Sequence, residues 1–149
     1  MMSDVKNGRM RDTWVELHDS RVAEAGQQPD GTYLITFAHL NVFERIADDD
    51  YEVWGYRAHL RITGPSDVGL PAKSSEDDRV VDGSVVLADG TDVSEDTAKF
   101  GLGVRFSNCR VKLWFASGGI LNVAGAEMAV ESAERLNFLE HWTGPLKSA

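Results

Sequence analysis

The stretch YEVWGYRAHLRITG, residues 51–64, decides the fold class of this 149-residue chain. Apolar side chains occupy every second position of it, namely Trp54, Tyr56, Ala58, Leu60 and Ile62. The positions between them carry Arg57, His59 and Arg61. A period of two is typical of a β-strand with one buried and one solvent-exposed face. We therefore predict a strand here, and we expect the pair Gly64-Pro65 to end it.

Two further stretches alternate in the same way but change phase part-way: TYLITFAHLNVFE, residues 32–44, and GVRFSNCRVKLWFASGG, residues 103–119. Such a change needs an extra residue or a bend, because half of the apolar side chains would otherwise face water. In the second stretch we place the bend at Ser107-Asn108. We expect Val111, Leu113 and Phe115, which alternate after it, to share one core with Trp54, Leu60 and Ile62. The pair Gly118-Gly119 then predicts a hairpin turn into another strand.

Two segments are harder to interpret. Residues 80–93, VVDGSVVLADGTDV, predict a strand around Val85 to Ala88 between two Asp-Gly turns. Residues 125–142, GAEMAVESAERLNFLEHW, fit a strand or a helix. We favour a strand to about Glu131, then a break and a short strand or turn, because periodicity separates the two poorly in short apolar runs.

Residues 64–79 and 88–103 show no regular pattern and are expected to form long loops, which in compact domains are usually functional or mobile. The several short strands separated by turn signals predict an all-β, mainly antiparallel fold. The expected architecture is a single-domain β-sandwich or a partly open barrel with at most one short helix. We expect this domain to span residues 13–146, after a flexible N-terminal segment of residues 1–12.

Composition excludes several classes of protein. The formal charge of −9 argues against nucleic-acid binding, which needs a basic surface. The N-terminal residues have no apolar segment of a signal peptide, and no apolar run is long enough to cross a membrane. Cys109 is the only cysteine, which fits a reducing compartment. We therefore expect a cytoplasmic protein with no nucleic-acid or membrane partner.

No motif in the chain predicts a cofactor or a metal ion. The glycines of GLGVRF, from residue 101, lack the third glycine and the strand-to-helix context of a dinucleotide loop. The acidic runs lack the glycine and ligand spacing of a calcium loop. The four histidines lack the spacing of a helical zinc pair.

The stretch ELHDSRV, residues 16–22, places the three residue types of a hydrolytic triad side by side as His18, Asp19 and Ser20. Neighbouring side chains of a strand point to opposite faces, so the three are not expected to form a triad with one another. The apolar phase also changes here, from Leu17 to Val22, which predicts a bulge in which Asp19 or Ser20 bonds the local backbone.

A second group of residues is a candidate binding surface. Arg57, His59 and Arg61 share the exposed phase of 51–64. Arg110, Lys112 and Trp114 share the exposed phase of 109–116. If the two strands lie in one sheet, these six residues form a cationic face with an aromatic residue on it, which is typical of an interaction surface. The alternative is that the cations pair with acidic neighbours across strands.

Two segments together resemble a known group of proteins: VELHDSRV followed by DGTYLITF, and the run from Cys109 that contains LWFASGGILNVAGAEMAV and FLEHWTGPL. The chain resembles small β-rich bacterial proteins of unknown function, some of which are similar to immunity-type proteins. The resemblance covers about half of the chain and transfers no functional residue. It implies a non-enzymatic, all-β bacterial protein.

The leading hypothesis is therefore a non-enzymatic binding or interaction module whose partner is another protein, with an immunity-like role as one form. The oligomeric state stays open, and a homodimer is included. One alternative is a small hydrolase or isomerase that uses His18, Asp19 or His59. Another is a carrier that holds a small ligand in a cavity between sheets. Converging ionisable groups in a pocket would favour the enzyme.

Overall fold

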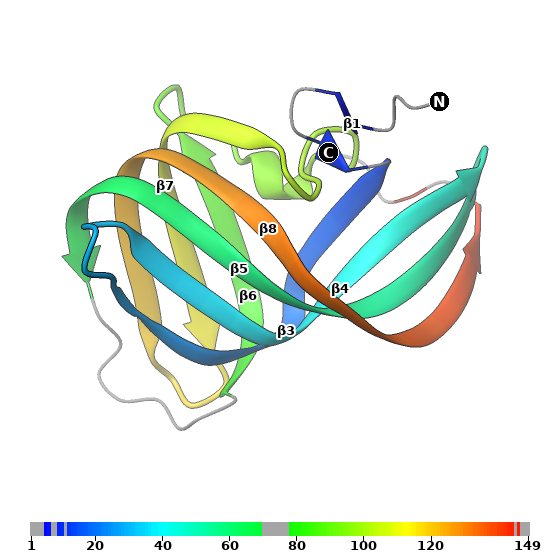
Figure 1. Ribbon diagram of the computed structural model, residues 1–149, viewed down its shortest axis with the longest axis horizontal. Coiled ribbons are helices and arrows are strands. Elements are labelled where there is room, and N and C mark those ends of the chain that lie inside the picture. The colour runs from blue at the N-terminus through cyan, green and yellow to red at the C-terminus, as the bar shows by residue number, and fades with distance from the viewer. Residues whose placement is uncertain (1–4, 7–8, 11, 70–77, 145, 147–149) are drawn as a thin grey trace.

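The protein is an all-β antiparallel fold, seen in a computed structural model that describes residues 5–6, 9–10, 12–69, 78–144 and 146 (Figure 1). The strands are β1 (Val5–Lys6), β2 (Arg9–Met10), β3 (Thr13–Gln27), β4 (Tyr33–Ala47), β5 (Asp50–Gly69), β6 (Asp78–Leu87), β7 (Arg105–Phe115) and β8 (Ile120–Thr143). One 3₁₀ turn, η1 (Val93–Glu95), is the only helical element in the described residues. No helix in that part of the chain is long and apolar enough to span a membrane.

Six of these strands close into a barrel in the order β3-β4-β5-β8-β7-β6, and β1 and β2 pair with each other. Both the all-β prediction and the antiparallel pairing are confirmed. The seam that closes the barrel is short among the residues that the structure describes, where β3 and β6 pair at Arg21–Arg79 and Val22–Asp78. The expected flexible segment of residues 1–12 lies mostly outside the described residues.

The barrel interior is filled with apolar side chains. Leu60, Ile62, Val111, Leu113 and Phe115 were predicted to share one core, and all five are buried. Trp54 was placed in the same core, and that prediction is wrong in part, because the ring is only partly buried. It lies where β5 leaves the barrel, so the neighbouring strands no longer enclose it.

The expected changes of phase are present. On β4 the register against β5 shifts between Phe37 and Leu40, where the apolar phase changes. On β7 the bend falls at Asn108, whose φ of 50° lies in the left-handed region that asparagine tolerates. The pairing of β7 with β8 continues across this bend without a register shift, so the chain bends there and gains no extra residue.

Two predicted boundaries are wrong. Strand β5 continues past Gly64-Pro65 to Gly69, because Gly64 adopts a positive φ of 62° and the pairing with β8 resumes after a register shift. Strand β6 begins at Asp78 and runs through Asp82-Gly83 without a turn. Residues 70–77, the middle of the predicted loop 64–79, lie outside the described residues.

The predicted loop 88–103 is irregular, as expected, but it contributes to the core. Val93, Phe100 and Leu102 are buried. The Val15 amide donates to the carbonyl oxygen of Phe100 at 2.8 Å, and the Gly103 amide donates to that of Val130 at 2.7 Å. The loop therefore covers the gap between β3 and β8 at one end of the barrel.

Strand β8 is one continuous strand of 24 residues, which excludes a helix in 125–142 and replaces the predicted break. Its pairing with β5 shifts register near Trp54, Tyr56 and Ala58, and each shift leaves one extra residue on β8. These unpaired residues are Ala133, Leu136 and Leu139, at intervals of three. Bulges increase strand twist, and β8 turns away from the barrel over this region (Figure 1).

Beyond the point where β7 stops pairing with β8, residues 41–47 of β4, 50–55 of β5 and 137–143 of β8 continue as a sheet, which we call the arm. Residues 13–16 of β3 pair with β4 at its base. Figure 1 shows it extending to the right of the barrel. Strand β7 stops pairing with β8 at Ala129. The arm residues of β8 therefore have a strand neighbour on one side only, within the described part of the chain.

Candidate functional site

Two adjacent hollows lie on the outer face of β3, one on each side of Trp14, whose side chain lines both. Trp14 is 9% exposed, and its indole Nε1 donates to the carbonyl oxygen of Ser94 at 3.4 Å. This bond ties β3 to the η1 turn. The hollows therefore lie between one barrel strand and the loop that covers the end of the barrel.

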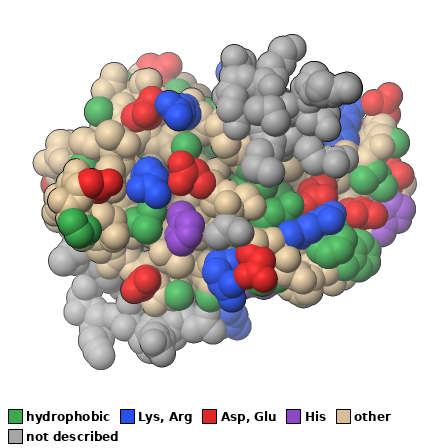
Figure 2. All heavy atoms as spheres, in the orientation of Figure 1, with side chains coloured by type: hydrophobic (Ala, Val, Ile, Leu, Met, Phe, Trp, Pro, Cys, Tyr) green, Lys and Arg blue, Asp and Glu red, His purple; other side chains and the backbone are tan. Residues whose placement is uncertain are grey.

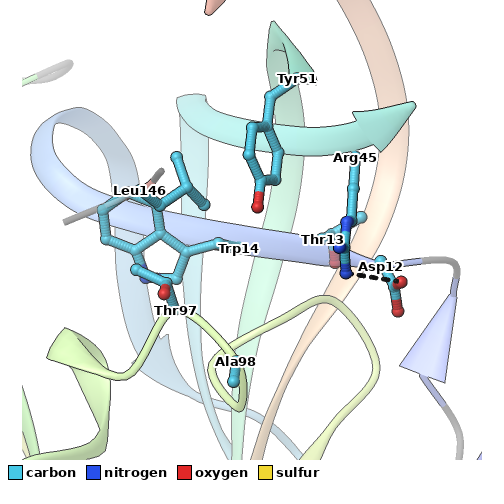
Figure 3. A pocket seen from close by; sticks show the side chains of 8 residues that line it. All are labelled: Asp12, Thr13, Trp14, Arg45, Tyr51, Thr97, Ala98 and Leu146. Atoms are coloured by element: carbon cyan, nitrogen blue, oxygen red, sulfur yellow. Dashed lines mark ion pairs between the residues drawn. The ribbon is translucent and has the colours of Figure 1, made fainter. Parts of the chain in front are cut away.

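The first hollow, of about 200 Å³, lies between Trp14 and the residues of the arm next to the β4–β5 turn, and we call it the Tyr51 hollow. Figure 3 shows the Tyr51 hydroxyl pointing into the space between Trp14 and Arg45. The Arg45 guanidinium lies 3.8 Å from the Asp12 carboxylate and 2.7 Å from that of Asp48. A ring face, a hydroxyl and an ion pair in one hollow suit a small polar molecule.

The second hollow, of about 260 Å³, lies over the open part of the seam between β3 and β6, and we call it the Glu16 hollow. Its ionisable lining residues are Glu16, His18, Asp82 and Glu95. Its floor is closed by Leu17, because a Cβ atom on Gly83 would lie 2.9 Å from the Leu17 Cβ. The two strands thus touch here without backbone pairing.

Burial raises the pKa of the Glu16 carboxyl above its ordinary value of 4.5, and this effect exceeds all the others. A hydrogen bond from the Asn41 amide, 3.3 Å long, and the nearby His18 act in the opposite direction. A carboxyl group that holds its proton more tightly next to an imidazole can exchange a proton with a bound molecule.

The three residues of the HDS stretch do not form a triad. The φ of Asp19 is 69°, which brings its carboxylate to 3.1 Å from His18 Nδ1, so these two neighbours do meet. Asp19 also pairs with Arg79 at 3.0 Å. Ser20 is fully buried, and its hydroxyl donates to the carbonyl oxygen of Leu17. The predicted bulge with a local backbone bond is therefore present.

The candidate catalytic residues lie in different places. His18 lines the Glu16 hollow. His59 does not line it and lies on β5, where its Nδ1 is 3.2 Å from the Thr36 hydroxyl. The structure therefore places His18 in the same hollow as Glu16, a residue that the sequence did not single out, and leaves His59 in another part of the barrel.

The structure places the six residues of the expected cationic face on strands that flank β8. Their positions differ along it, since Arg61 lies opposite Ala129 and Arg110 opposite Ala124. Arg57 pairs with Glu134, and Arg61 with Glu131 at 3.1 Å. Arg110 pairs with Asp67 at 3.0 Å, which matches the alternative of pairing with acidic neighbours.

Lys112 and Trp114 contact each other, since the Lys112 ammonium lies 5.9 Å from the centre of the Trp114 ring. Figure 2 shows basic side chains next to acidic ones over the face that β5 and β8 form. The six residues thus give two separate groups in which most cations already have an anionic partner.

The arm carries most of the large exposed apolar side chains among the described residues. Every residue of 137–143 on β8 is exposed. Four of the six large apolar side chains with high exposure are in the arm: Ile46, Phe138, Leu139 and Trp142. The sequence did contain a signal for them, because FLEHW places apolar residues in both phases of a strand, and one buried face cannot accommodate both.

The inner side of the arm, which continues the barrel interior, is held by a network around Glu44. This carboxylate is 5% exposed and accepts hydrogen bonds from the Tyr56 hydroxyl and, at 2.6 Å, from Arg135. The Arg135 guanidinium also lies 3.6 Å from the centre of the Trp54 ring. The two donors satisfy the buried carboxylate. The network therefore links β4, β5 and β8 on this side of the arm.

No family model matches the chain, and neither a curated protein nor a solved structure does. Among the residues that the structure describes, no group of three or more histidine, cysteine, aspartate or glutamate side chains is arranged to hold a metal ion.

Proposed function

We propose that this protein is a non-enzymatic interaction module that binds another protein through the arm, in a bacterial cytoplasm. One observation carries the proposal. Seven consecutive residues of β8, 137–143, are exposed, and they include Phe138, Leu139 and Trp142. Large apolar side chains that are exposed together on one element are typical of an interaction site, and aromatic residues are the side chains that most often anchor one.

The rest of the molecule supports an interaction module more than a carrier. The barrel interior is filled with side chains of zero exposure, such as Ile35, Leu60 and Val111. A ligand between the strands would therefore have to displace packed core side chains. Loss of one large core side chain lowers the free energy of unfolding by about 2–5 kcal/mol. The resemblance to immunity-type proteins suggests one concrete form of the function, in which the bound partner is blocked.

Capture of the partner in the native cytoplasm tests this proposal. Tagged wild-type protein is cross-linked in the cell next to the double variant Phe138→Ser, Trp142→Ser. The matched control is Val68→Ser, Ile120→Ser, which changes the exposed apolar side chains outside the arm. We expect the same partner with wild type and control and its loss with the arm variant. An equal yield from all three would show that the arm is not the binding surface.

One observation favours an enzyme as the second candidate, namely that His18 and a carboxyl of raised pKa line the same hollow, the Glu16 hollow. Such a site would catalyse proton transfer in a hydrolase or isomerase reaction. The variants His18→Ala and Glu16→Gln test it on any activity that a substrate screen finds. A loss of about a thousandfold in both, with stability intact, supports the enzyme, and a change within about tenfold contradicts it.

A further inference from the structure

We infer that the partner holds the arm in an apolar cleft with a basic rim, so that the arm enters it as a wedge. This inference rests on the proposed function and adds the chemistry and shape of the partner's site. It follows from three observations: the apolar anchors lie on both faces of the arm, the arm is acidic, and its free edge does not suit strand pairing.

The two aromatic anchors lie on opposite faces. Phe138 is opposite Trp54 on β5, and the two rings meet edge to face at 5.5 Å. Trp142 is opposite Tyr51 and packs against Phe43 at 6.3 Å. Trp54 and Tyr51 are three residues apart on one strand, so their side chains point to opposite sides. A flat partner covers only one of these anchors, whereas a cleft covers both.

The negative charge of the arm favours basic groups around the partner's cleft. Residues 41–55 and 137–143 hold six carboxylates, Glu44, Asp48, Asp49, Asp50, Glu52 and Glu140, against one arginine, Arg45. Arg135 and His141 pair with some of them. Asp49 and Glu140 have no ion pair with any residue that the structure describes. Basic groups on the partner would neutralise this excess and speed the encounter.

The free edge of β8 argues against the simplest competing mode, in which a partner strand pairs with it. Its register against β5 shifts three times between Ala133 and Leu139. Bulges at such short intervals break the even spacing of backbone donors and acceptors that strand addition needs, and natural proteins use them to protect sheet edges. Side-chain contact is therefore the mode of binding that the arm allows.

The test uses a small host with the inferred chemistry, a β-cyclodextrin that carries amino groups on its rim, next to the neutral and the carboxymethylated forms. Each has an apolar cavity that takes one aromatic ring. Ring NMR signals of the full-length protein are followed during titration at low salt. We expect the amino form to bind at Phe138 and at Trp142, about tenfold more tightly than the carboxymethylated form, which is about 1.4 kcal/mol.

Two variants test the wedge geometry. If the anchors lie on separate faces, Trp142→Ala leaves host binding at Phe138 unchanged, and Phe138→Ala leaves binding at Trp142 unchanged. Loss of both sites in one variant would show a single shared surface and overturn the wedge. Val68→Ala is the matched control outside the arm and should change neither site.

The remaining outcomes separate the two proposals. Equal binding of the three hosts at both rings overturns the basic rim but keeps the arm as an apolar binding surface. Absence of any signal change at both rings contradicts the arm as a binding surface as well. Sedimentation of the free protein tests whether a second copy of the chain binds the arm. A dimer that Phe138→Ala or Trp142→Ala converts to a monomer would show this and would overturn the inference.

Discussion

The hydroxyl of Ser20 donates a hydrogen bond to the carbonyl oxygen of Leu17, three residues earlier, across 2.6 Å. Between them Asp19 adopts a positive φ of 69°, and the register of β3 against β4 shifts at this point. The bond satisfies a buried hydroxyl and a backbone acceptor where the strand ladder is interrupted. Ser20 thus holds the bulge that separates the seam from the open part of β3.

Replacement of Ser20 by alanine should destabilise the protein by about 1–3 kcal/mol, because the Leu17 carbonyl would lose its partner next to a fully buried position. Urea unfolding followed by tryptophan fluorescence measures the change. Ser107→Ala, at an exposed strand position, is the matched control and should change the free energy of unfolding by less than about 0.5 kcal/mol. Equal effects of the two variants would show that the bond does not support the bulge.

Truncation of Leu113 to alanine should cost about 2–5 kcal/mol, because this side chain has zero exposure in the barrel core. Ile120→Ala removes a side chain of similar size from the next strand, where it is 45% exposed, and should cost much less. Thermal and urea unfolding of both variants check the prediction. A Leu113 variant as stable as wild type would mean that the strand faces the other way.

Glu16→Gln should make the protein more stable at neutral pH. Burial raises the pKa of the folded-state carboxyl above 4.5, so the wild type is penalised once this group is charged. The penalty is absent below the unfolded pKa and grows as pH rises through the folded pKa. The advantage of the variant should therefore disappear on acidification toward pH 4.5.

Asp89→Asn is the control of opposite sign, because hydrogen bonds from the Thr91 amide and hydroxyl lower the pKa of the Asp89 carboxyl below 3.8. These hydrogen bonds stabilise the folded protein at pH values above 3.8, and this stabilisation is lost as the pH falls through the folded-state pKa of Asp89. The variant should be less stable than wild type at neutral pH and approach it in acid. Unfolding measured across pH for both variants tests the two signs, and parallel curves would contradict the burial of Glu16.

Cys109 should react slowly with iodoacetamide in the folded protein at pH 8. The thiol is 5% exposed, and burial raises its pKa to about 11, so little of the reactive thiolate exists although the residue borders an open hollow of about 350 Å³. Alkylation followed by mass spectrometry, with and without urea, measures the rate. A rate in the folded state equal to that in urea would show that the thiol is accessible and ionised.

Local alternation was enough to predict the strands β4, β5 and β7 and part of the core. Leu60 and Ile62 on β5, and Val111 and Leu113 on β7, were placed correctly because side chains of a strand point alternately to its two faces. The bulge at Asp19-Ser20 and the bend at Asn108 were also predictable, since each coincides with a change of apolar phase. These features depend only on residues near one another in the chain.

The arm, the seam and the two hollows depend on pairing between segments that are distant in the sequence. The alternation of apolar and polar residues does not predict such pairing. Trp54 follows the alternation of β5, yet it is only partly buried, because it lies opposite Phe138 in the bulged part of β8, beyond Ala129, where β7 stops pairing with β8. Glu16 gains its raised pKa from the enclosure of its carboxyl, with Asp82 and Glu95 of other segments lining the same hollow.

One physical reason separates the features that the sequence predicted from those that only the tertiary structure shows. The sequence sets which face of a strand a residue takes, because that is a property of its own backbone. Register, strand order and the ends of each pairing set what lies against that face, and these are chosen by contacts along the whole chain. Arg57 shows both: its exposed phase followed from 51–64, while its partner Glu134 followed only from the pairing of β5 with β8.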